Sequence, residues 1–547
     1  MNPSALDALF AGQDFAAAPG CVAALLDGDV VAWQGCFGLA RLDTTAILTP
    51  ATRMRIASIT KPMVALTLAA LEDEGKLALT DPLSRHVPEH RFEADPTLAQ
   101  MLAMKSGIPE TYPLVWLALG DAARLAEHSQ ALLALLLAQR QLNFLPGERT
   151  LYANANTVLL HLVTERATGE PLARLMQRHV FDPAGMVSAV LDDSLAHRLP
   201  ETAIGYARSG ERFVPADPVS VEAAPGGVIA SLADMIAWHR WLRGNPRGWR
   251  TRLAGAVPHN DGSSSGYAHG FVRQSLSGVQ VIGHAGGHSG WASDYLYAPD
   301  KDVAVIILAN RADANVYERA REMLVTALGV PPDPGATPAL TSSAPEPVWE
   351  ATYASVEAIA SLSVKGGPGE IAVDGRRMPR GKDGVFRRTL GVEPFVIEGP
   401  NTATPPAELT RWEGNHAVNY RRVDDAATLP AEAIIGTYAC ASLPHPVTIK
   451  ADSCGVLRVF TGPVWPGGEG WPLVPVCGAL FRCTMPDGAP SEVHLRFEAD
   501  ADGPVTHVSF GFLRLLRITL ARIKPPVAEQ WRDLGLAAPK LLAGDAP

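Results

Sequence analysis

The sequence has no run of basic residues. Its 57 aspartates and glutamates outnumber its 47 lysines and arginines, which gives a net charge of −10. Nucleic-acid binding depends mainly on lysine and arginine side chains that neutralise phosphates, so we do not expect a nucleic-acid partner. Charged residues make up only 19% of the chain and hydrophobic residues 47%, which are the proportions of a globular protein rather than a disordered one.

Long apolar segments and clustered cysteines are also missing. The first twenty residues carry Asp7 and Asp14 and lack a basic segment followed by an apolar one, so we expect neither a secretion signal nor a membrane span. The six cysteines do not have the spacing of metal ligands, and we expect no metal and no organic cofactor. Without a signal the thiols should be reduced, which predicts a cytoplasmic protein.

At 547 residues the chain is too long for one ordinary core, and about three or four folding units are expected. In residues 1–332 the predicted order is strands, many helices, strands and a last helix, which indicates an antiparallel sheet with helices on its faces. Residues 333–347 are rich in Pro, Ser, Thr and Ala and are predicted to be a linker. Residues 348–425 and 430–525 contain short predicted strands separated by turns, which indicates two small barrels or sandwiches.

Local patterns predict the main elements of the first unit. Two apolar segments, 21–26 and 30–33, flank an Asp-Gly-Asp turn and predict a hairpin. An almost wholly apolar run up to Leu71 predicts a buried helix over 58–75. Ser231 and Asp234 have the spacing of a capping box at a helix start. Further strands are expected at 267–272, 280–283, 291–297 and 303–308, and a helix is expected at 316–328.

The motif Ser58-Ile59-Thr60-Lys61 opens the predicted helix over 58–75. Pro62 fits only the first turn of a helix, so Ser58 should lie at the N-terminus with Lys61 on the same face. A serine hydroxyl needs an adjacent base, and a desolvated lysine loses its proton more easily. The motif therefore predicts Ser58 as a nucleophile and Lys61 as its base. A bare S-x-x-K also arises by chance, although Ser58 is the only serine here with Lys at +3.

Two further motifs could complete such a site. Tyr152 and Asn154 form a Tyr-x-Asn triplet ahead of a predicted helix, where they could move protons and orient the lysine. Alternatively, Tyr152 only packs and Asn154 caps the helix. His284, Gly286 and Gly287 lie between two predicted strands, where glycines allow a substrate backbone to approach and a strand N–H can stabilise an oxyanion. The alternative is a turn with a surface histidine.

In order and separation, the three motifs resemble those of the penicillin-recognising serine hydrolases, which are related to class C β-lactamases and D-Ala-D-Ala carboxypeptidases. Within that group the chain is most similar to the D-stereospecific aminopeptidases. The stretches that carry the resemblance are TRMRIASITK, FLPGERTLYANAN, HVFDPAGM, SLADMIAW, GHAGGHSGW and ALGVPP. The resemblance implies a β-lactamase-like α+β catalytic domain followed by two all-β, barrel-like domains. It is strong over residues 1–332 and weaker after that.

The resemblance also implies roles for individual residues. They are Ser58 as nucleophile, Lys61 as general base, Tyr152 as the relay of the proton to the leaving amine, Asn154 as its companion, His284 as the histidine in place of the β-lactamase Lys-Thr-Gly lysine, Gly286 as a substrate-binding residue, and the N–H groups of Ser58 and Gly287 as the oxyanion hole.

Substrate selection is expected to depend on charge near the nucleophile. An aminopeptidase holds a free ammonium, which a fixed cation would repel, so a histidine in place of lysine is reasonable. In the family an acidic residue on a loop of the last domain binds that ammonium. The matching loop is 461–471, and its only acid is Glu469, where the family has aspartate. Glu469 could instead be a solvated loop residue.

The sequence thus predicts an acyl-enzyme hydrolase that removes a small, preferably D, N-terminal residue from peptides, amides or esters. By resemblance, a homodimer is expected and β-lactams are possible inhibitors. Two alternatives remain open. One is a β-lactamase-like esterase or DD-peptidase on the same catalytic domain, and the other is a non-catalytic ligand-binding or sensor protein.

Overall fold

The computed structural model describes residues 3–523 apart from short gaps. The gaps are 12–14, 120–128, 193–201, 217–222, 332–348, 356, 368–369, 375, 381–384, 391–392, 399–403, 414–415, 425–426, 462–469, 484–492, 500–502 and 513–514. The predicted linker 333–347, the loop residue Glu469 and most of its loop therefore lie outside the described residues.

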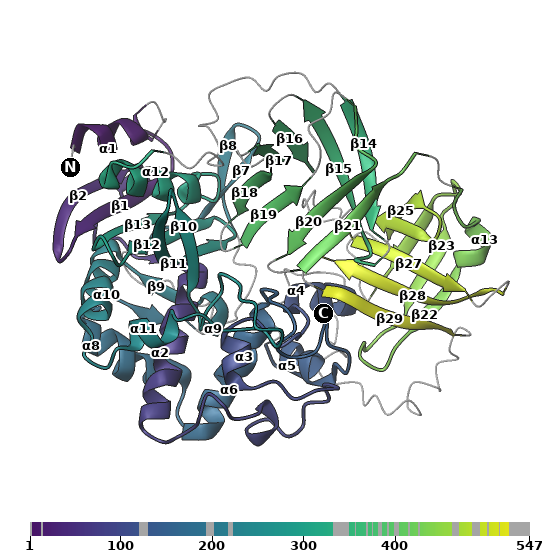
Figure 1. The fold of residues 1–547 in the computed structure, drawn as a ribbon, viewed down its shortest axis with the longest axis horizontal. Coiled ribbons are helices and arrows are strands. Elements are labelled where there is room, and N and C mark those ends of the chain that lie inside the picture. The colour runs from purple at the N-terminus through teal and green to yellow at the C-terminus, as the bar shows by residue number, and fades with distance from the viewer. Residues whose placement is uncertain are drawn as a thin grey trace.

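A six-stranded antiparallel sheet forms the centre of the first unit (Figure 1). Its strands, in spatial order, are β10 (Val272–Leu276), β11 (Val279–His288), β12 (Trp291–Ala298), β13 (Val303–Ala309), β1 (Cys21–Asp27) and β2 (Val30–Phe37). The first strand of the chain thus lies between its hairpin partner and a strand from the end of the unit. The predicted hairpin and antiparallel sheet are confirmed.

Two expectations for this sheet are wrong in detail. The strand predicted over 267–272 begins only at Val272, because 267–271 form a loop in which Tyr267 makes an isolated bridge to Val272. The motif that starts at His284 was expected between strands but lies inside β11, which continues to His288. Its two glycines carry no side chains, so the alternation that marks a strand is absent there.

Helices cover both faces of the sheet. α1 (Pro3–Phe10) and α12 (Val316–Leu328) lie on one face, and α2 (Thr60–Asp73) and α10 (Leu232–Gly244) lie on the other. Side chains of β1 and β13 alternate between the two cores, as a pleated strand requires. Because both faces are covered, β12 and β13 are buried along their whole length and read as nearly continuous apolar runs.

The predicted central helix is confirmed within two residues at each end. A 3₁₀ turn, η1 (Ala57–Ile59), leads into α2, in which every residue from Thr60 to Leu71 is buried. The capping box of Ser231 and Asp234 at the start of α10 is also confirmed.

The other helices of the unit are η2 (Leu83–Arg85), α3 (Leu98–Leu102), α4 (Thr111–Leu119), α5 (Ser129–Ala138), α6 (Asn154–Thr168), α7 (Leu172–Met176), η4 (Gln177–Phe181), α8 (Asp182–Ala184), α9 (Ala223–Gly226) and α11 (Trp249–Leu253). The small strands are β3 (Leu39–Arg41), β4 (Ala46–Ile47), β5 (Met54–Arg55), β6 (Val190–Leu191), β7 (Tyr206–Ser209), β8 (Arg212–Pro215) and β9 (Val228–Ala230).

Two strand-rich units follow, and they lie side by side in Figure 1. The first is an eight-stranded meander, β14 to β21, whose end strands meet at a bridge between Arg380 and Phe386. The second, β22 to β29, is a closed eight-stranded barrel preceded by the short helix α13 (Ala431–Ile434). The expected pair of barrel-like units is therefore confirmed.

The meander strands are β14 (Trp349–Ser355), β15 (Ala360–Gly367), β16 (Glu370–Val373), β17 (Arg376–Pro379), β18 (Phe386–Leu390), β19 (Glu393–Glu398), β20 (Glu408–Glu413) and β21 (His416–Arg422). The barrel strands are β22 (Gly436–Ala439), β23 (Val447–Ala451), β24 (Leu457–Phe460), β25 (Trp471–Cys477), β26 (Leu480–Cys483), β27 (Val493–Ala499), β28 (Val505–Phe512) and β29 (Leu515–Ile523).

The closed barrel contacts the first unit through one of its ends. Gln139 Nε2 donates to the carbonyl of Ser442, between β22 and β23, at 2.9 Å. The N–H of Leu516, at the start of β29, donates to Asn143 Oδ1 at 2.9 Å. Successive strands of the barrel are antiparallel neighbours, so the β22–β23, β24–β25 and β28–β29 connections all leave from the same end. That end faces the first unit.

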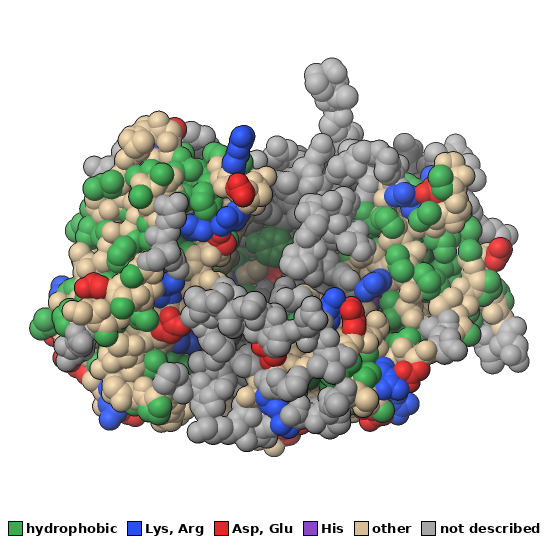
Figure 2. All heavy atoms as spheres, turned by 90° about the horizontal axis from the view of Figure 1, so that it is seen from above, with side chains coloured by type: hydrophobic (Ala, Val, Ile, Leu, Met, Phe, Trp, Pro, Cys, Tyr) green, Lys and Arg blue, Asp and Glu red, His purple; other side chains and the backbone are tan. Residues whose placement is uncertain are grey.

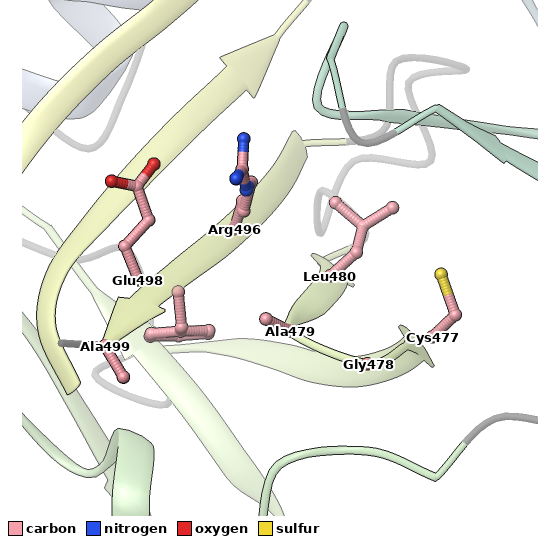
Figure 3. Close-up of a pocket in the computed structure, with 8 residues that line it drawn as sticks. Cys477, Gly478, Ala479, Leu480, Arg496, Glu498 and Ala499 are labelled. Carbon is pink, nitrogen blue, oxygen red and sulfur yellow. The ribbon is translucent and has the colours of Figure 1, made fainter. Parts of the chain in front are cut away.

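The surface carries a hollow in this barrel and another near the centre of one face of the molecule. The barrel hollow has a volume of about 490 Å³ and lies where the β25–β26 turn meets the end of β27 (Figure 3). Its lining residues are Cys477, Gly478, Ala479, Leu480, Arg496, Phe497, Glu498 and Ala499. Figure 2 shows a second hollow near the centre of one face, with hydrophobic side chains at its bottom. Charged side chains described on that face lie in small groups of both signs. Among the described helices, none combines the length and the apolar character that a membrane crossing requires.

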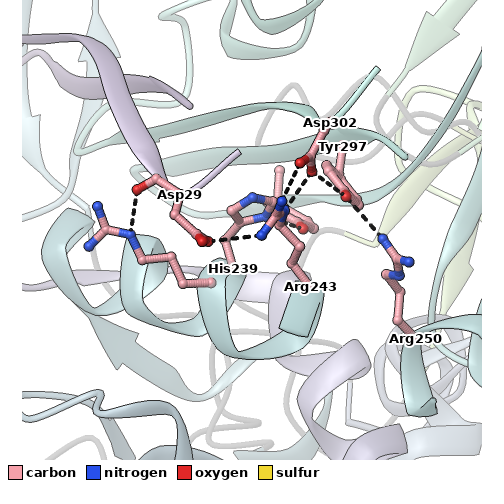
Figure 4. Close-up of polar contacts among 8 residues, drawn as sticks. Asp29, His239, Arg243, Arg250, Tyr297 and Asp302 are labelled. Carbon is pink, nitrogen blue, oxygen red and sulfur yellow. Dashed lines mark hydrogen bonds and ion pairs between the residues drawn. The ribbon is translucent and has the colours of Figure 1, made fainter. Parts of the chain in front are cut away.

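A polar network joins the β1–β2 turn to α10 and to the β12–β13 turn (Figure 4). Arg243 of α10 forms a two-bond ion pair with Asp302 and a further contact of 3.2 Å with Asp29. Tyr297 of β12 donates to Asp302 at 2.8 Å. A bidentate arginine–carboxylate pair fixes both position and orientation, so the network ties two turns to one helix.

His239 lies in this region with no exposed surface, and we expect it to destabilise the protein in acid. Its Nδ1 is 2.9 Å from the Tyr295 hydroxyl, and its Nε2 has no hydrogen-bond partner among the described residues. Burial lowers the pKa of His239 to about 4 from 6.5. The unfolded chain therefore binds this proton more tightly, and stability is lost as the pH falls from about 6.5 toward 4.

Replacing His239 by Gln should remove this acid sensitivity. From pH 7.5 to pH 5, the free energy of unfolding should fall by about 2 kcal/mol less in His239→Gln than in wild type. Thermal unfolding midpoints at the two pH values measure this difference. His161→Gln, at a half-exposed ion pair, is the matched control and should follow wild type. An equal loss in wild type and His239→Gln would contradict the prediction.

Candidate active site

Ser58 lies in the turn just before α2, where the chain bends sharply. Ala57, the residue before it, has a left-handed φ of 48°, which is uncommon for a residue with a side chain. Two contacts hold the bend: Thr60 Oγ1 donates to the Ala57 carbonyl at 2.7 Å, and the Ile56 N–H donates to the Val228 carbonyl at 3.0 Å. Ser58 is partly exposed, whereas both its neighbours are buried. The bend therefore presents one hydroxyl to solvent from a buried helix start.

Two side chains meet the hydroxyl of Ser58. Lys61 Nζ lies 3.0 Å from Ser58 Oγ and also donates to the Pro225 carbonyl at 2.7 Å. The Tyr152 hydroxyl lies 2.8 Å from the same Oγ. Lys61 is only 2% exposed, and its Nζ is 4.8 Å from the centre of the Tyr152 ring. The structure thus brings together the lysine one helical turn away and a tyrosine about a hundred residues on.

Asn154 is the first residue of α6, and its surroundings include an acid that sequence reasoning did not single out. Its backbone N–H donates to both oxygens of Glu110 at 3.1 Å, and its side-chain Nδ2 lies 3.4 Å from Glu110 Oε2. Glu110 has no exposed surface and also accepts from the N–H and hydroxyl of Thr111. The carboxylate sits at the N-terminus of α6, which favours negative charge. The contact fixes which way the amide of Asn154 points.

His284 is buried on β11 and uncharged at neutral pH. Its Nδ1 is 2.6 Å from the Ala285 carbonyl, which can only accept, so Nδ1 carries the proton. Its Nε2 then accepts from the Tyr267 hydroxyl at 2.9 Å. Burial and, to a smaller extent, the Lys61 charge lower the pKa of His284 to about 3. The rings of Tyr152, Tyr267 and His284 lie within about 6 Å of one another, centre to centre, which joins the second and third motifs.

The glycines after His284 let β11 approach Ser58. A Cβ on Gly286 would lie 2.3 Å from the Ile56 carbonyl oxygen and 3.1 Å from the Ser58 nitrogen, so no larger residue fits without movement. Beyond Gly283, β11 has no partner residue on β10, so this part of its edge borders the site. The backbone of β11 at Gly286, the residue before Gly287, therefore lies close to the Ser58 nitrogen.

Sequence reasoning missed three parts of this site. The Pro225 carbonyl is a backbone group, so no pattern of side chains in the sequence predicts its contact with Lys61. Tyr267 falls where a strand was expected, and Glu110 contacts Asn154 across 44 residues. The one signal in the sequence that could have suggested a buried acid is the presence of apolar residues near Glu110. Among the described residues, no three His, Cys, Asp or Glu side chains are grouped as metal ligands.

The arrangement can be compared with known proteins. The profile of the beta-lactamase family matches residues 6–329, more than half of the chain. The chain belongs to the beta-lactamase family. This membership confirms the β-lactamase-like fold that the three motifs predicted for the first unit.

Relatives of this beta-lactamase-family chain extend over its C-terminal units as well. The D-aminopeptidase of Gluconobacter oxydans (strain 621H) is 28% identical over 465 residues, 84% of this chain and 86% of the relative. The D-aminopeptidase of Brucella anthropi is 26% identical over 539 residues, 94% and 96% of the two chains. Among solved structures, the octameric penicillin-binding protein homologue from Pyrococcus abyssi covers 95% of this chain and 100% of its own, with 18% identity and a TM-score of 0.55. The last comparison shows a shared fold, and the first two confirm the resemblance to D-aminopeptidases.

Proposed function

We propose that the chain is a serine aminopeptidase that releases a small, preferably D, N-terminal residue from peptides, amides or esters through an acyl-enzyme on Ser58. The observation that carries the proposal is the meeting of Lys61 Nζ and the Tyr152 hydroxyl on Ser58 Oγ, at 3.0 and 2.8 Å. The extent of similarity to two D-aminopeptidases, over 84% and 94% of the chain, supports it.

The proposed reaction has two halves. Lys61, in its uncharged form, takes the proton of Ser58 while Oγ attacks the substrate carbonyl. The N–H groups of Ser58 and Gly287 stabilise the oxyanion, and Gly286 borders the substrate backbone. Tyr152 passes a proton to the leaving amine, and the acyl group stays on Ser58. A water activated by the same lysine and tyrosine then releases the amino acid and restores Ser58.

The neutrality of His284 supports a substrate with a free amino group. With its pKa near 3, His284 places no fixed cation on β11 at neutral pH. A substrate ammonium is therefore not repelled from this strand, whereas a substrate carboxylate finds no permanent partner on it. Asn154, held by Glu110, is proposed to orient Lys61 and the substrate carbonyl. Glu110 itself already accepts hydrogen bonds from four donor groups of Thr111 and Asn154 and has no exposed surface, so it is a poor partner for an incoming ammonium.

The acid that pairs with the ammonium is proposed to be Glu469. Strand β24 ends and strand β25 begins at the barrel end that faces the first unit, and residues 461–471 join the two strands in sequence. A buried ammonium needs a charged partner, because leaving it unpaired is costly. The direction of the barrel end makes the 461–471 loop a suitable source of that partner. A homodimer is retained as a proposal, to be tested by light scattering.

Replacing Glu469 by Gln keeps the shape and removes the charge. The ratio of kcat/KM for a free D-alanine p-nitroanilide to that for its N-acetylated form should fall about tenfold or more, mainly through KM. Glu432→Gln, at an exposed glutamate of the same barrel unit, is the matched control and should keep the wild-type ratio. If the ratio is unchanged in Glu469→Gln, Glu469 does not bind the substrate ammonium and is a solvated loop residue.

A panel of substrates tests the function as a whole. D- and L-alanine p-nitroanilides, each free and N-acetylated, should show turnover of the free D form above the other three. Preference for N-blocked esters or for carboxylate-ended peptides would favour the esterase or DD-peptidase alternative. Binding of these compounds without turnover would favour the sensor alternative.

A further inference from the structure

The peptide bond between Gly286 and Gly287 is held from the far face of the sheet. The hydroxyl of Tyr317, in the first turn of α12, donates to the Gly286 carbonyl at 3.0 Å. No cis peptide bond occurs among the described residues, so this carbonyl and the N–H of Gly287 point in opposite directions within one planar unit. A contact that fixes the carbonyl therefore also fixes the direction of the N–H.

The surroundings of Tyr317 suit a hydroxyl that donates and does not ionise. Burial, followed by the nearby Asp294 carboxyl, raises the pKa of Tyr317 well above its ordinary value. Residue 287 must also be glycine for the contact to form, because a Cβ there would lie 2.9 Å from the Tyr317 hydroxyl oxygen. The tyrosine and the glycine thus fit each other across the sheet.

The first turn of α12 is itself anchored to two strands. Arg321 Nη1 donates to the Tyr317 carbonyl at 2.8 Å, and Nη2 donates to Gln274 of β10 at 3.0 Å. The same guanidinium is 3.8 Å from Asp294 of β12, which lies opposite Ala285 of β11. Tyr317 therefore approaches β11 from a helix end that is fixed to the strands on both sides of it.

We propose that Tyr317 is a positioning residue for catalysis: its hydroxyl holds the Gly286–Gly287 peptide so that the Gly287 N–H stays aimed at the reacting carbonyl oxygen. Gly286 and Gly287 pair with Ser293 and Ala292 of β12, but glycine backbone is more flexible than that of other residues, so the Tyr317 contact gives this peptide a further fixed point. A donor that is oriented in advance needs no reorganisation when charge develops on the oxygen. The inference rests on the proposed function, since it requires the Gly287 N–H to be an oxyanion donor.

Tyr317→Phe tests the role because it keeps the ring and removes only the donor. Removing an oxyanion donor outright costs about 10²–10³ in kcat, and loosening one should cost less, so we expect kcat to fall about tenfold with KM changed less than twofold. Inhibition by 1-aminoethylboronic acid, whose tetrahedral adduct on Ser58 places an oxygen in the same position, should weaken by the same factor. Competitive inhibition by D-alaninol, which has the free amino group but no carbonyl to be attacked, should not change.

The matched control is Tyr297→Phe, which removes a tyrosine hydroxyl from β12 at its contact with Asp302. It should lower the unfolding midpoint but leave kcat and the boronic acid inhibition at wild-type values. A Tyr317→Phe enzyme with wild-type kcat, or with lower kcat but unchanged boronic acid inhibition, would overturn the positioning role. If wild type itself shows neither turnover nor a Ser58 boronate adduct, the proposed function fails first and the role of Tyr317 fails with it.

Discussion

Replacing Ser58 by alanine is expected to abolish turnover and covalent labelling together. Ser58 Oγ is the atom on which Lys61 and Tyr152 converge, and in the proposed mechanism an alanine leaves both of them without a nucleophile to activate. The loss in kcat should be about 10³-fold or more, because all three groups act as one unit. The measurement is hydrolysis of D-alanine p-nitroanilide, with intact-mass analysis after incubation with an activated ester and with a slowly hydrolysed β-lactam.

The labelled peptide should contain Ser58 and no other modified serine. Ser84→Ala, which removes an exposed hydroxyl bonded to Asp95, is the control and should keep both labelling and turnover. The Ser58→Ala protein should unfold at the wild-type temperature within about two degrees, because the side chain is partly exposed and small. Activity that survives in Ser58→Ala would refute the acyl-enzyme mechanism.

Tyr152→Phe and Lys61→Ala should each lower kcat by about 10² or more, the usual scale for losing a general acid–base group. The Tyr152 hydroxyl is 2.8 Å from Ser58 Oγ, so Tyr152→Phe removes the proposed proton carrier and keeps the ring that packs on Tyr267. Lys61 is almost completely buried, and alanine removes the base while it leaves the Pro225 carbonyl without that donor. Steady-state kinetics with one ester and one anilide measure both losses.

In Tyr152→Phe, kcat should fall more for the anilide than for the ester. An amine leaving group needs a proton, whereas a good alcohol leaving group does not. Tyr353→Phe, which removes a buried hydroxyl from β14 of the second unit, is the matched control and should retain wild-type kcat. If Tyr152→Phe has nearly wild-type kcat on the anilide, Tyr152 is a packing residue and the proton route must be sought elsewhere.

The helix that begins after Ser58 was predictable because its evidence is local. Pro62 allows only a first-turn position, the apolar run up to Leu71 allows only a buried helix, and both Ser58 and Lys61 follow from that geometry. The hairpin and α12 were predictable for the same reason, since a turn or a regular apolar period lies within one short window. The short C-terminal strands separated by turns likewise predicted barrel-like units, although not which strand would be the neighbour of which.

The parts that could not be predicted depend on distant residues or on backbone atoms. Pro225 and Gly286 act through carbonyl oxygens, which every residue possesses, so composition cannot single them out. Tyr317 reaches β11 from a helix whose pattern only indicates packing on a sheet. Asn154 was expected to serve Lys61 or cap a helix, and its contact with Glu110 depends on a loop brought in from a separate segment.

The position of β1 has a consequence for how the protein is made. The N-terminal part of the sheet pairs with residues that come almost 290 positions later, as in the bond between the Gly20 N–H and Asn310 Oδ1. At a synthesis rate of about 5–20 residues per second, the first strands leave the ribosome roughly 15–60 s before their partners do. During that interval β1 is an apolar strand with one open edge, which invites pairing with other nascent chains. We therefore expect a higher yield of folded protein when the first forty residues are shielded until β13 has emerged.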